Sequence, residues 1–383
     1  MDLRLADTDQ LLLEQARAML AADAPPERLA EWEDSADGFD RRLWARIVDL
    51  GWPGVAFAEF AGGGGGSPAS LGVLAGEIGR AAFPSPFLPT VSAGLVAARL
   101  GTTKRSTTVL EAICRDGAAA TLLWAPGCGS RLEATRRGDL LVVSGRLVAD
   151  WASAASLLVG LAPVGGPGSL AAVREVAVFA VDAGTPGVTI EARRSFDNER
   201  VAVVRLDDVV VDPADHLVDG GAVPADVAAE ALGAVRLVRA AELVGIAERT
   251  LELTASYVST RVQFGVPLGT FQAVQHACAD VAILVHGAKL LTQEGLSGPP
   301  SSHRRAGALA AYHAGRAAVA AAVTGAQLHG GVGMIRDYPL HFYYRRAKAM
   351  QLRLGPAAAQ LEELARTVVD PVAESAGTPA PWL

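Results

Sequence analysis

The chain has 383 residues and a formal net charge of −7, and it is 50% apolar but only 5% aromatic. This length allows large buried cores, and two or three packed units are expected. The acidic balance and the lack of a long basic run argue against nucleic-acid binding.

Neither the cysteines nor the N-terminal residues indicate export or membrane insertion. Cys114, Cys128 and Cys278 lack the spacing of a metal or redox site, which fits a reduced compartment. Residues 1–20 mix acidic and apolar side chains and predict an amphipathic helix, not a signal peptide. No apolar run approaches the roughly 18 residues of a membrane span. We therefore expect a soluble cytoplasmic protein.

The first zone, residues 1–116, is predicted to be a helical domain. Its apolar residues recur at helical spacing, as in Leu71, Leu74 and Ile78. Glycines at 62–66 and prolines at 84–89 divide the zone into several helices.

The second zone, residues 117–222, has short β-branched runs between turn signals. The runs are Leu140–Ser144, Ser156–Gly160, Val176–Val181 and Val201–Leu206. Such spacing predicts a small antiparallel barrel or sandwich.

The third zone, residues 223–383, returns to long helical patterns, which a Gly- and Pro-rich loop at 295–302 interrupts. It predicts a C-terminal helical bundle. The whole chain is therefore expected to be an α+β multidomain protein with the order helical, β, helical.

The most informative motif is Arg261-Val-Gln-Phe-Gly265. An anionic pyrophosphate is well matched by a planar guanidinium, so Arg261 is a candidate bidentate ligand. Phe264 offers a face on which adenine can stack. A solvated cation at a helix end is the alternative for Arg261.

Two further segments complete this pattern. Gln272 and Gln327 each offer a donor and an acceptor to adenine or ribose. Gly330 and Gly331 let the backbone approach phosphates because they carry no Cβ. Together with Arg261 and Phe264 these residues predict a dinucleotide-binding segment. His329, which lies between Gln327 and Gly330, is interpreted as a structural turn residue in preference to a general base.

These motifs, in this order, resemble the acyl-CoA dehydrogenase family over nearly the whole chain. Other matching segments are Gly51-Trp-Pro-Gly54, Glu77-Ile-Gly-Arg-Ala81, Val181–Val188 and Ala240-Ala-Glu-Leu-Val-Gly245. The resemblance implies an N-terminal helical domain, a central β domain and a C-terminal four-helix bundle. It also implies FAD shared at subunit interfaces, an acyl-CoA thioester substrate, and a role for the six residues above in holding FAD.

The turn that contacts the flavin ring in the family is altered here. The segment Leu123–Arg131 has Trp124 where the family has a threonine, and Ala125 and Arg131 where it has acidic residues. Trp124 either narrows the ring pocket or stacks near the ring, and obstruction is the preferred interpretation.

The α-proton base of the family has no counterpart at either usual position. Reading without gaps from Arg345–Lys348 places Leu354 at one position, and Val235 occupies the other. Neither side chain can accept a proton, so no catalytic residue is assigned. Arg236, beside Val235, matches a family arginine near the thioester and CoA tail; a plain surface cation is the alternative.

Three other carboxylates are conceivable replacements for the base, and each has a simpler role. Glu242 lies two turns beyond Val235 and is assigned a helix-packing or hydrogen-bonding role. Asp337 is assigned a turn-capping role. Glu199, on a β-zone turn, is interpreted as a surface charge.

The preferred hypothesis is a base-lacking subunit of a heteromeric acyl-CoA dehydrogenase. It resembles bacterial steroid side-chain enzymes, in which two different family subunits form an α2β2 assembly and share each FAD site. The alternatives are a self-sufficient flavin oxidase or monooxygenase, including one that forms a homo-oligomer, and a cofactor-free scaffold or binding subunit.

Overall fold

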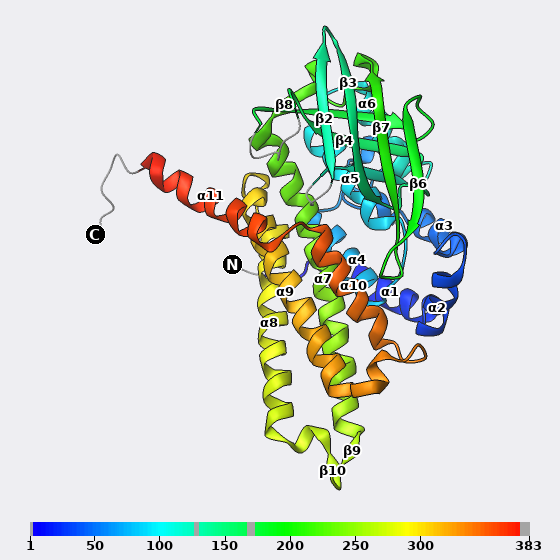
Figure 1. The fold of residues 1–383 in the computed structure, drawn as a ribbon, viewed down its shortest axis with the longest axis vertical. Coiled ribbons are helices and arrows are strands. Elements are labelled where there is room, and N and C mark those ends of the chain that lie inside the picture. The colour runs from blue at the N-terminus through cyan, green and yellow to red at the C-terminus, as the bar shows by residue number, and fades with distance from the viewer. Residues whose placement is uncertain (1–2, 126–129, 167–172, 376–383) are drawn as a thin grey trace.

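The computed structural model describes residues 3–125, 130–166 and 173–375, and it shows the order helical, β, helical that the sequence predicts (Figure 1). The β layers lie at one end of the molecule. The long C-terminal helices run from this end to the opposite one. The predicted fold class is therefore confirmed in its main features.

Six helices form the N-terminal zone. They are α1 (Asp7–Asp23), α2 (Pro26–Asp34), α3 (Arg41–Asp49), α4 (Pro68–Arg80), α5 (Phe87–Leu100) and α6 (Lys104–Cys114). Their starts have local causes. The Asp40 carboxylate accepts hydrogen bonds from the backbone N–H groups of Arg42 and Leu43 and so caps α3. Thr103 caps α6 in the same way.

The β zone consists of two four-stranded sheets. Their strands are β1 (Ala120–Leu123), β2 (Arg131–Arg137), β3 (Leu140–Asp150), β4 (Leu157–Pro163), β5 (Glu175–Asp182), β6 (Val188–Arg194), β7 (Arg200–Val211) and β8 (Ala222–Pro224). The first sheet has the order β1-β4-β5-β8 and the second the order β2-β3-β7-β6. Apolar side chains from both sheets, including Val143, Phe179 and Val204, form one core.

Of the two expected forms, a barrel or a sandwich, the barrel is not formed, because the two packed sheets stay open. One detail of the β prediction is wrong: β1 pairs with β4 in parallel, from Ala120 opposite Leu157. The physical reason is the path of the chain. Strand β3 continues past its pairing with β2 to Asp150, whose carbonyl oxygen accepts a hydrogen bond from Thr121, so the chain returns to the first sheet at the end where β1 began. Local alternation of apolar residues does not encode that return.

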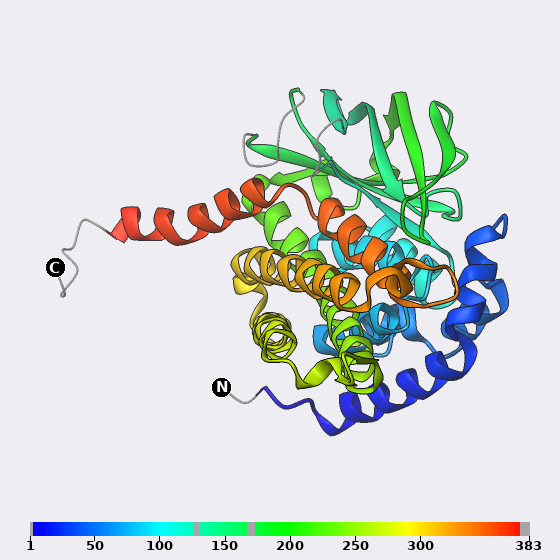
Figure 2. The same ribbon diagram turned by 60° about the horizontal axis from the view of Figure 1, so that its bottom comes forward.

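Five helices form the C-terminal zone. They are α7 (Ala225–Thr260), α8 (Gln272–Ser297), α9 (His303–His329), α10 (Leu340–Arg353) and α11 (Ala357–Ser375), with a hairpin of β9 (Val262–Gln263) and β10 (Val266–Pro267) after α7. In both views α11 extends away from the rest of the chain (Figures 1 and 2). Among the described helices none is long and apolar enough to cross a membrane.

A single large core joins the N-terminal and C-terminal helices across α4, α5 and α7. At the α4–α7 crossing the two backbones touch through glycines. A Cβ added to Gly245 would lie 1.9 Å from the carbonyl oxygen of Gly76. Only glycine allows this approach.

We predict that Gly245→Ala lowers the free energy of unfolding by about 1–3 kcal/mol, because the new methyl group overpacks the α4–α7 contact. Gly287→Ala on α8 is the matched control, since a Cβ there meets no atom within 4 Å. Alanine also forms helix better than glycine, so the control should keep or gain stability. Urea unfolding of both variants measures the difference. Equal stability would contradict the inferred backbone contact.

Candidate functional site

The predicted dinucleotide segment lies at the end of the helical bundle farthest from the sheets (Figure 1). Helix α7 ends at Thr260, Arg261 follows as its C-cap, and the hairpin turns at Phe264 and Gly265, which both have positive φ values of 54° and 80°. The Phe264 side chain is 89% exposed, and its ring meets Phe271 edge-on at 6.1 Å.

The glycine turn is brought to the same end of the bundle. Gly330 ends α9 with φ +60°, and a Cβ at Gly330 or Gly331 would meet no atom within 4 Å. Tyr257, one turn before Arg261, joins the two segments. Its ring stacks on the His329 ring, with 4.2 Å between the two ring centres. The sequence motifs do not single out Tyr257.

The side chains of this segment face away from their own chain. Arg261, Gln272 and Gln327 are exposed. The Arg261 guanidinium makes no hydrogen bond or ion pair with any residue that the structure describes. An open cation beside unobstructed glycine backbone fits the phosphate and adenine half of FAD. Such a surface suits a cofactor whose remaining contacts come from elsewhere.

His329 is engaged at both ring nitrogens. Its Nδ1 lies 2.8 Å from the Gly325 carbonyl oxygen and its Nε2 lies 3.0 Å from the Tyr338 hydroxyl. Burial lowers the pKa of His329. The ring therefore holds the turn in place, as the structural interpretation expects.

A second group of predicted residues lines a cavity of about 420 Å³ between the β zone and the start of α7. Trp124, Arg236 and Leu354 all contribute to its wall. Trp124 is 7% exposed, and the Arg236 guanidinium carbon lies 5.6 Å from the centre of its ring. The adjacent residues Pro126–Gly129 of the altered ring turn, including Cys128, lie outside the described residues.

Arg236 is not a plain surface cation. Its side chain is partly buried, its Nε has no hydrogen-bond partner among the described residues, and burial lowers its pKa. A buried guanidinium that faces a cavity attracts an anionic or strongly polar ligand. This position is compatible with the substrate-binding role that the resemblance implies.

The two positions that the sequence analysis matches to the family's base are apolar and buried. Val235 is 0% exposed and Leu354 is 2% exposed. Three acidic residues line the cavity: Glu363 pairs with Arg304 at 2.6 Å, Glu362 pairs with Arg366 at 2.7 Å, and the exposed Asp226 accepts a hydrogen bond from the backbone N–H of Val227. Burial alone would raise the pKa of Glu363, but the hydrogen bond and the positive charge of Arg304 outweigh it and lower that pKa. A carboxylate with a lowered pKa is a weak proton acceptor.

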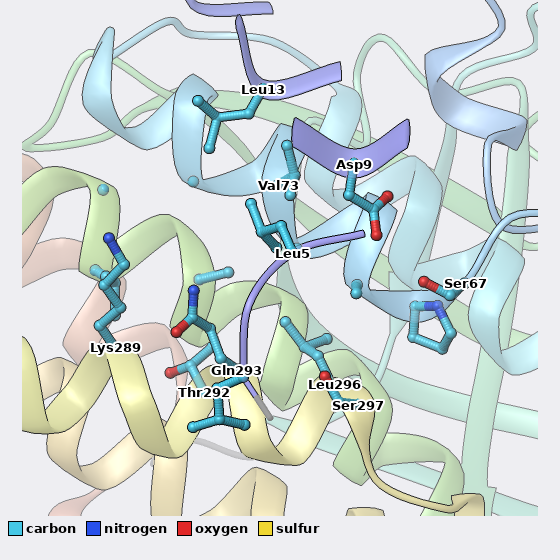
Figure 3. A pocket seen from close by; sticks show the side chains of 18 of the residues that line it. Leu5, Asp9, Leu13, Ser67, Val73, Lys289, Thr292, Gln293, Leu296 and Ser297 are labelled. Atoms are coloured by element: carbon cyan, nitrogen blue, oxygen red, sulfur yellow. The ribbon is translucent and has the colours of Figure 1, made fainter. Parts of the chain in front are cut away.

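Another cavity, of about 430 Å³, lies farther along α7 on a different face, between α1, α4 and α8 (Figure 3). Apolar side chains such as Leu13 and Leu296 line it. The charged groups Lys289 and Glu248 at its edge pair with each other at 2.8 Å. None of the residues predicted for the FAD or substrate site contributes to it.

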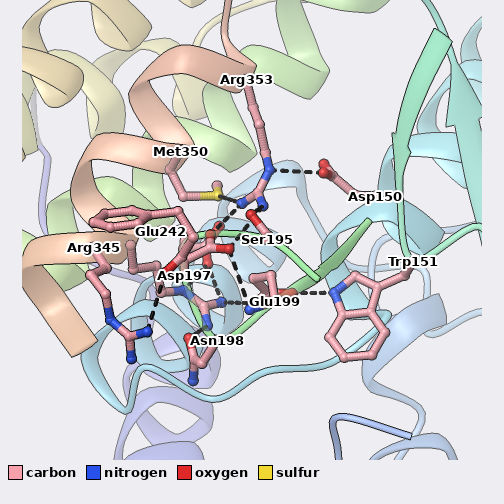
Figure 4. A network of polar contacts seen from close by, with 12 residues as sticks. Asp150, Trp151, Ser195, Asp197, Asn198, Glu199, Glu242, Arg345, Met350 and Arg353 are labelled. Atoms are coloured by element: carbon pink, nitrogen blue, oxygen red, sulfur yellow. Dashed lines mark hydrogen bonds and ion pairs between the residues drawn. The ribbon is translucent and has the colours of Figure 1, made fainter. Parts of the chain in front are cut away.

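The junction of the three zones contains a buried network of charges (Figure 4). Arg346 on α10 is 2% exposed, and its Nη2 lies 2.5 Å from a carboxylate oxygen of Glu242 and 2.5 Å from one of Glu199. Glu242 is fully buried, so its hydrogen-bonding role is confirmed.

The interpretation of Glu199 as a surface charge is wrong. Glu199 is 6% exposed and accepts a hydrogen bond from the indole N–H of Trp151. The turn between β6 and β7 packs inward against α10, so Glu199 is buried although the sequence of its turn is polar. Asp337, by contrast, is exposed.

Arg353 extends this network toward the cavity. Its guanidinium binds Asp197 at 2.7 Å and Asp150 at 2.9 Å. Since Arg353 immediately precedes Leu354, these ion pairs hold the start of the turn at Leu354. The sequence signal is the charge-rich stretch Asp197–Arg200, whose local pattern is that of a surface turn.

Comparison with known proteins now decides the family. The sequence model of the acyl-CoA dehydrogenase N-terminal domain matches residues 6–116, and that of the acyl-CoA dehydrogenase C-terminal domain matches residues 225–369. This chain belongs to the acyl-CoA dehydrogenase family. As such it is an oxidoreductase relative, and members of its family normally bind FAD.

Similar members of the family come from mycobacteria. The chain is 31% identical to the acyl-CoA dehydrogenase FadE27 of Mycobacterium tuberculosis, over 97% of this chain and 99% of that one. It is 27% identical to the acyl-CoA dehydrogenase IpdE2 of Mycolicibacterium smegmatis, over 94% and 98%.

Solved structures add a similarity to a complex of two family members. The chain superposes on a chain of the ChsE4-ChsE5 complex of Mycobacterium tuberculosis with a TM-score of 0.86 and 28% identity, over 99% of this chain and 100% of that one. It also superposes on a chain of a variant of the steroid acyl-CoA dehydrogenase Tcur3481-Tcur3483, with a TM-score of 0.83 and 29% identity over 97% and 99%.

We predict that Arg346→Met strongly destabilises this acyl-CoA dehydrogenase-family chain, by about 3–5 kcal/mol, because Glu199 and Glu242 lose their buried cation. Arg336→Met is the control, since Arg336 pairs with Asp34 where both side chains are mostly exposed. Thermal unfolding should show a large fall in Tm for the first variant and little change for the second. Similar Tm values would contradict the role assigned to Arg346.

Proposed function

We propose that this chain is the base-lacking subunit of a heteromeric acyl-CoA dehydrogenase and that it completes the FAD site of a different family subunit. One observation carries the proposal: the side chains proposed to bind FAD are exposed on the outside of the bundle, while the positions matched to the family's base hold Leu354, on the wall of the chain's own cavity, and the fully buried Val235. In this proposal the chain keeps the residues that bind FAD and has lost the proton-accepting residue.

In this assembly each residue of the exposed segment has a separate task. Arg261 pairs with the pyrophosphate, Phe264 packs on adenine, and Gln272 and Gln327 bond to adenine or ribose. Gly330 and Gly331 admit the phosphates to the backbone. The exposure of these groups and the lack of a partner for Arg261 among the described residues support a cofactor that is shared across an interface.

The partner subunit supplies what this chain lacks. In the dehydrogenation of an acyl thioester, bound FAD would supply the hydride acceptor for Cβ, and a carboxylate would remove the α-proton. Val235 and Leu354 have no proton-accepting group, so that carboxylate belongs to the partner. The similarity to a chain of the ChsE4-ChsE5 complex supports an α2β2 assembly of two family members. The steroid relatives make a bulky acyl-CoA the preferred substrate class.

Arg236 and Trp124 have a separate role in this chain's own cavity. The partly buried guanidinium stacks on the indole face, and together they occupy part of the space beside Leu354. We infer that they narrow this cavity against a flavin ring, and that Arg236 orients a thioester or CoA group there without turnover.

We expect the chain alone to show no acyl-CoA dehydrogenation, and its complex with a base-carrying family subunit to be yellow and active. Size-exclusion chromatography, flavin absorbance and dye-coupled activity of the separate and co-expressed chains measure this. A flavin-saturated homo-oligomer that oxidises acyl-CoA would overturn the proposal. Reduction of a yellow single chain by NADH, with oxygen uptake, would favour the self-sufficient flavoenzyme. A colourless complex would favour the scaffold.

Within the complex, Arg261→Ala should weaken FAD binding about 10- to 100-fold, because one charge-assisted contact with the pyrophosphate is lost. Arg305→Ala is the control, since Arg305 is also exposed but lies near the other end of the bundle, at the start of α9. FAD titration of the deflavinated complexes measures both variants. Unchanged FAD affinity in Arg261→Ala would remove the residue from the site.

A further inference from the structure

A small cavity lies inside the buried charge network and shares no lining residue with the cavity of Arg236 and Leu354. Its volume is about 10 Å³, close to the space that one water molecule needs. Ser85, Trp151 and Glu199 lie on its wall, together with Arg239 and Glu242 of α7. Figure 4 shows Trp151, Glu199 and Glu242 of this wall within the network.

Three buried polar atoms at this cavity have no hydrogen-bond partner among the residues that the structure describes. They are Oγ of Ser85, Nε of Arg239 and Oε2 of Glu242. Ser85 is 4% exposed, Arg239 is 4% exposed and Glu242 is 0% exposed. Leaving such groups unsatisfied costs about 1–3 kcal/mol each, so a ligand that bonds to all three is strongly favoured.

The three atoms restrict the chemistry of that ligand. The Arg239 N–H repels a metal cation, and the carboxylates of Asp150 and Glu199 on the cavity wall repel an anion. The Ser85 hydroxyl can form a hydrogen bond with either a donor or an acceptor. A neutral molecule that both donates and accepts, and that has the size of the cavity, is water.

The charges around the cavity also do not balance. Four carboxyl groups face three guanidinium groups; these are Asp150 of β3, Asp197 and Glu199 of the β6–β7 turn, Glu242 and Arg239 of α7, and Arg346 and Arg353 of α10. The residues of α4 and α5 at the cavity, Ile78, Leu88 and Pro89, carry no charge. One proton makes the cluster neutral.

The contacts select the carboxyl group that carries this proton. Glu199 accepts from Trp151 at one oxygen and pairs with Arg346 at the other, so neither oxygen is free to carry a hydrogen. Glu242 accepts from Arg346 Nε and Nη2 at Oε1 only, at 3.0 and 2.5 Å. Its Oε2 faces the cavity and can carry a hydrogen that donates to an occupant.

We propose that this cavity is a binding site for one water molecule and that Glu242, protonated at Oε2, donates a hydrogen bond to it. The water accepts hydrogen bonds from Glu242 and from Arg239 Nε, and it donates one to Ser85 Oγ. The water thus links α7 to the segment between α4 and α5. With one proton on Glu242, the four carboxyl groups and three guanidinium groups of the network carry no net charge.

Titration of the carboxyl pair follows from the same burial. Burial raises the pKa of Glu242, and it raises the pKa of Glu199 to about 8. The pair therefore holds one proton more in the folded chain than in the unfolded chain above the usual carboxyl pKa of about 4.5. Its contribution to stability is complete below that pH and is lost as the pH rises through the raised pKa of Glu242.

The test compares Glu242→Gln with Glu199→Gln in the full chain. The amide of Glu242→Gln can reproduce the protonated carboxyl, with its oxygen toward Arg346 and its N–H toward the water. We expect this variant to match the wild type near pH 4, below the usual carboxyl pKa. Wild type should then lose up to tenfold in the folding equilibrium constant per pH unit, relative to the variant, as the pH rises. Urea unfolding from pH 4 to 9 measures the difference.

Glu199→Gln must turn an N–H group toward Trp151 or Arg346, so it should unfold at lower urea concentration at every pH. If Glu199→Gln instead abolishes the pH dependence and Glu242→Gln is the damaged variant, the assignment of the proton is wrong. A high-resolution crystal structure of the wild type is the second measurement and does not depend on either variant. One water within hydrogen-bond distance of all three atoms supports the site, and an empty or ion-filled cavity overturns it.

Discussion

The buried contacts of Arg346 with Glu199 and Glu242 are the interaction on which the rest of the structure depends. Each of the three residues comes from a different segment: α10, the β6–β7 turn and α7. All three side chains are buried, so none can exchange its partner for water without a large cost. The cluster therefore fixes how the β zone sits on the helical bundle.

That constraint reaches the candidate site through one neighbouring residue. Arg353, held by Asp150 and Asp197, directly precedes Leu354. The turn at Leu354, on the wall of the candidate cavity, is thus firmly held although its side chain is apolar. A rigid apolar turn at this place is what the proposed base-lacking subunit requires. The exposed segment around Arg261, at the other end of α7, is free of that support and faces outward.

Several features were predictable because their cause is local. The order helical, β, helical follows from the change of apolar period along the chain, and the family from the ordered motifs around Arg261, Gln327 and Ala240–Gly245. The apolar residues at Val235 and Leu354 follow directly from the matched segments. The burial of Glu242 in a hydrogen-bonding role follows from its place among small and apolar residues on one helix.

Sequence alone determined which groups the candidate site contains: an arginine, a phenylalanine, two glutamines and two glycines in the proposed nucleotide segment, and apolar residues at Val235 and Leu354. Only the tertiary structure decided where those groups lie. The parallel pairing of β1 with β4, the stacking of Tyr257 on His329 and the burial of Glu199 all join residues distant in sequence. Their partners are selected by packing across the whole chain, and a charged turn has the same local pattern whether it meets water or an arginine 147 positions later.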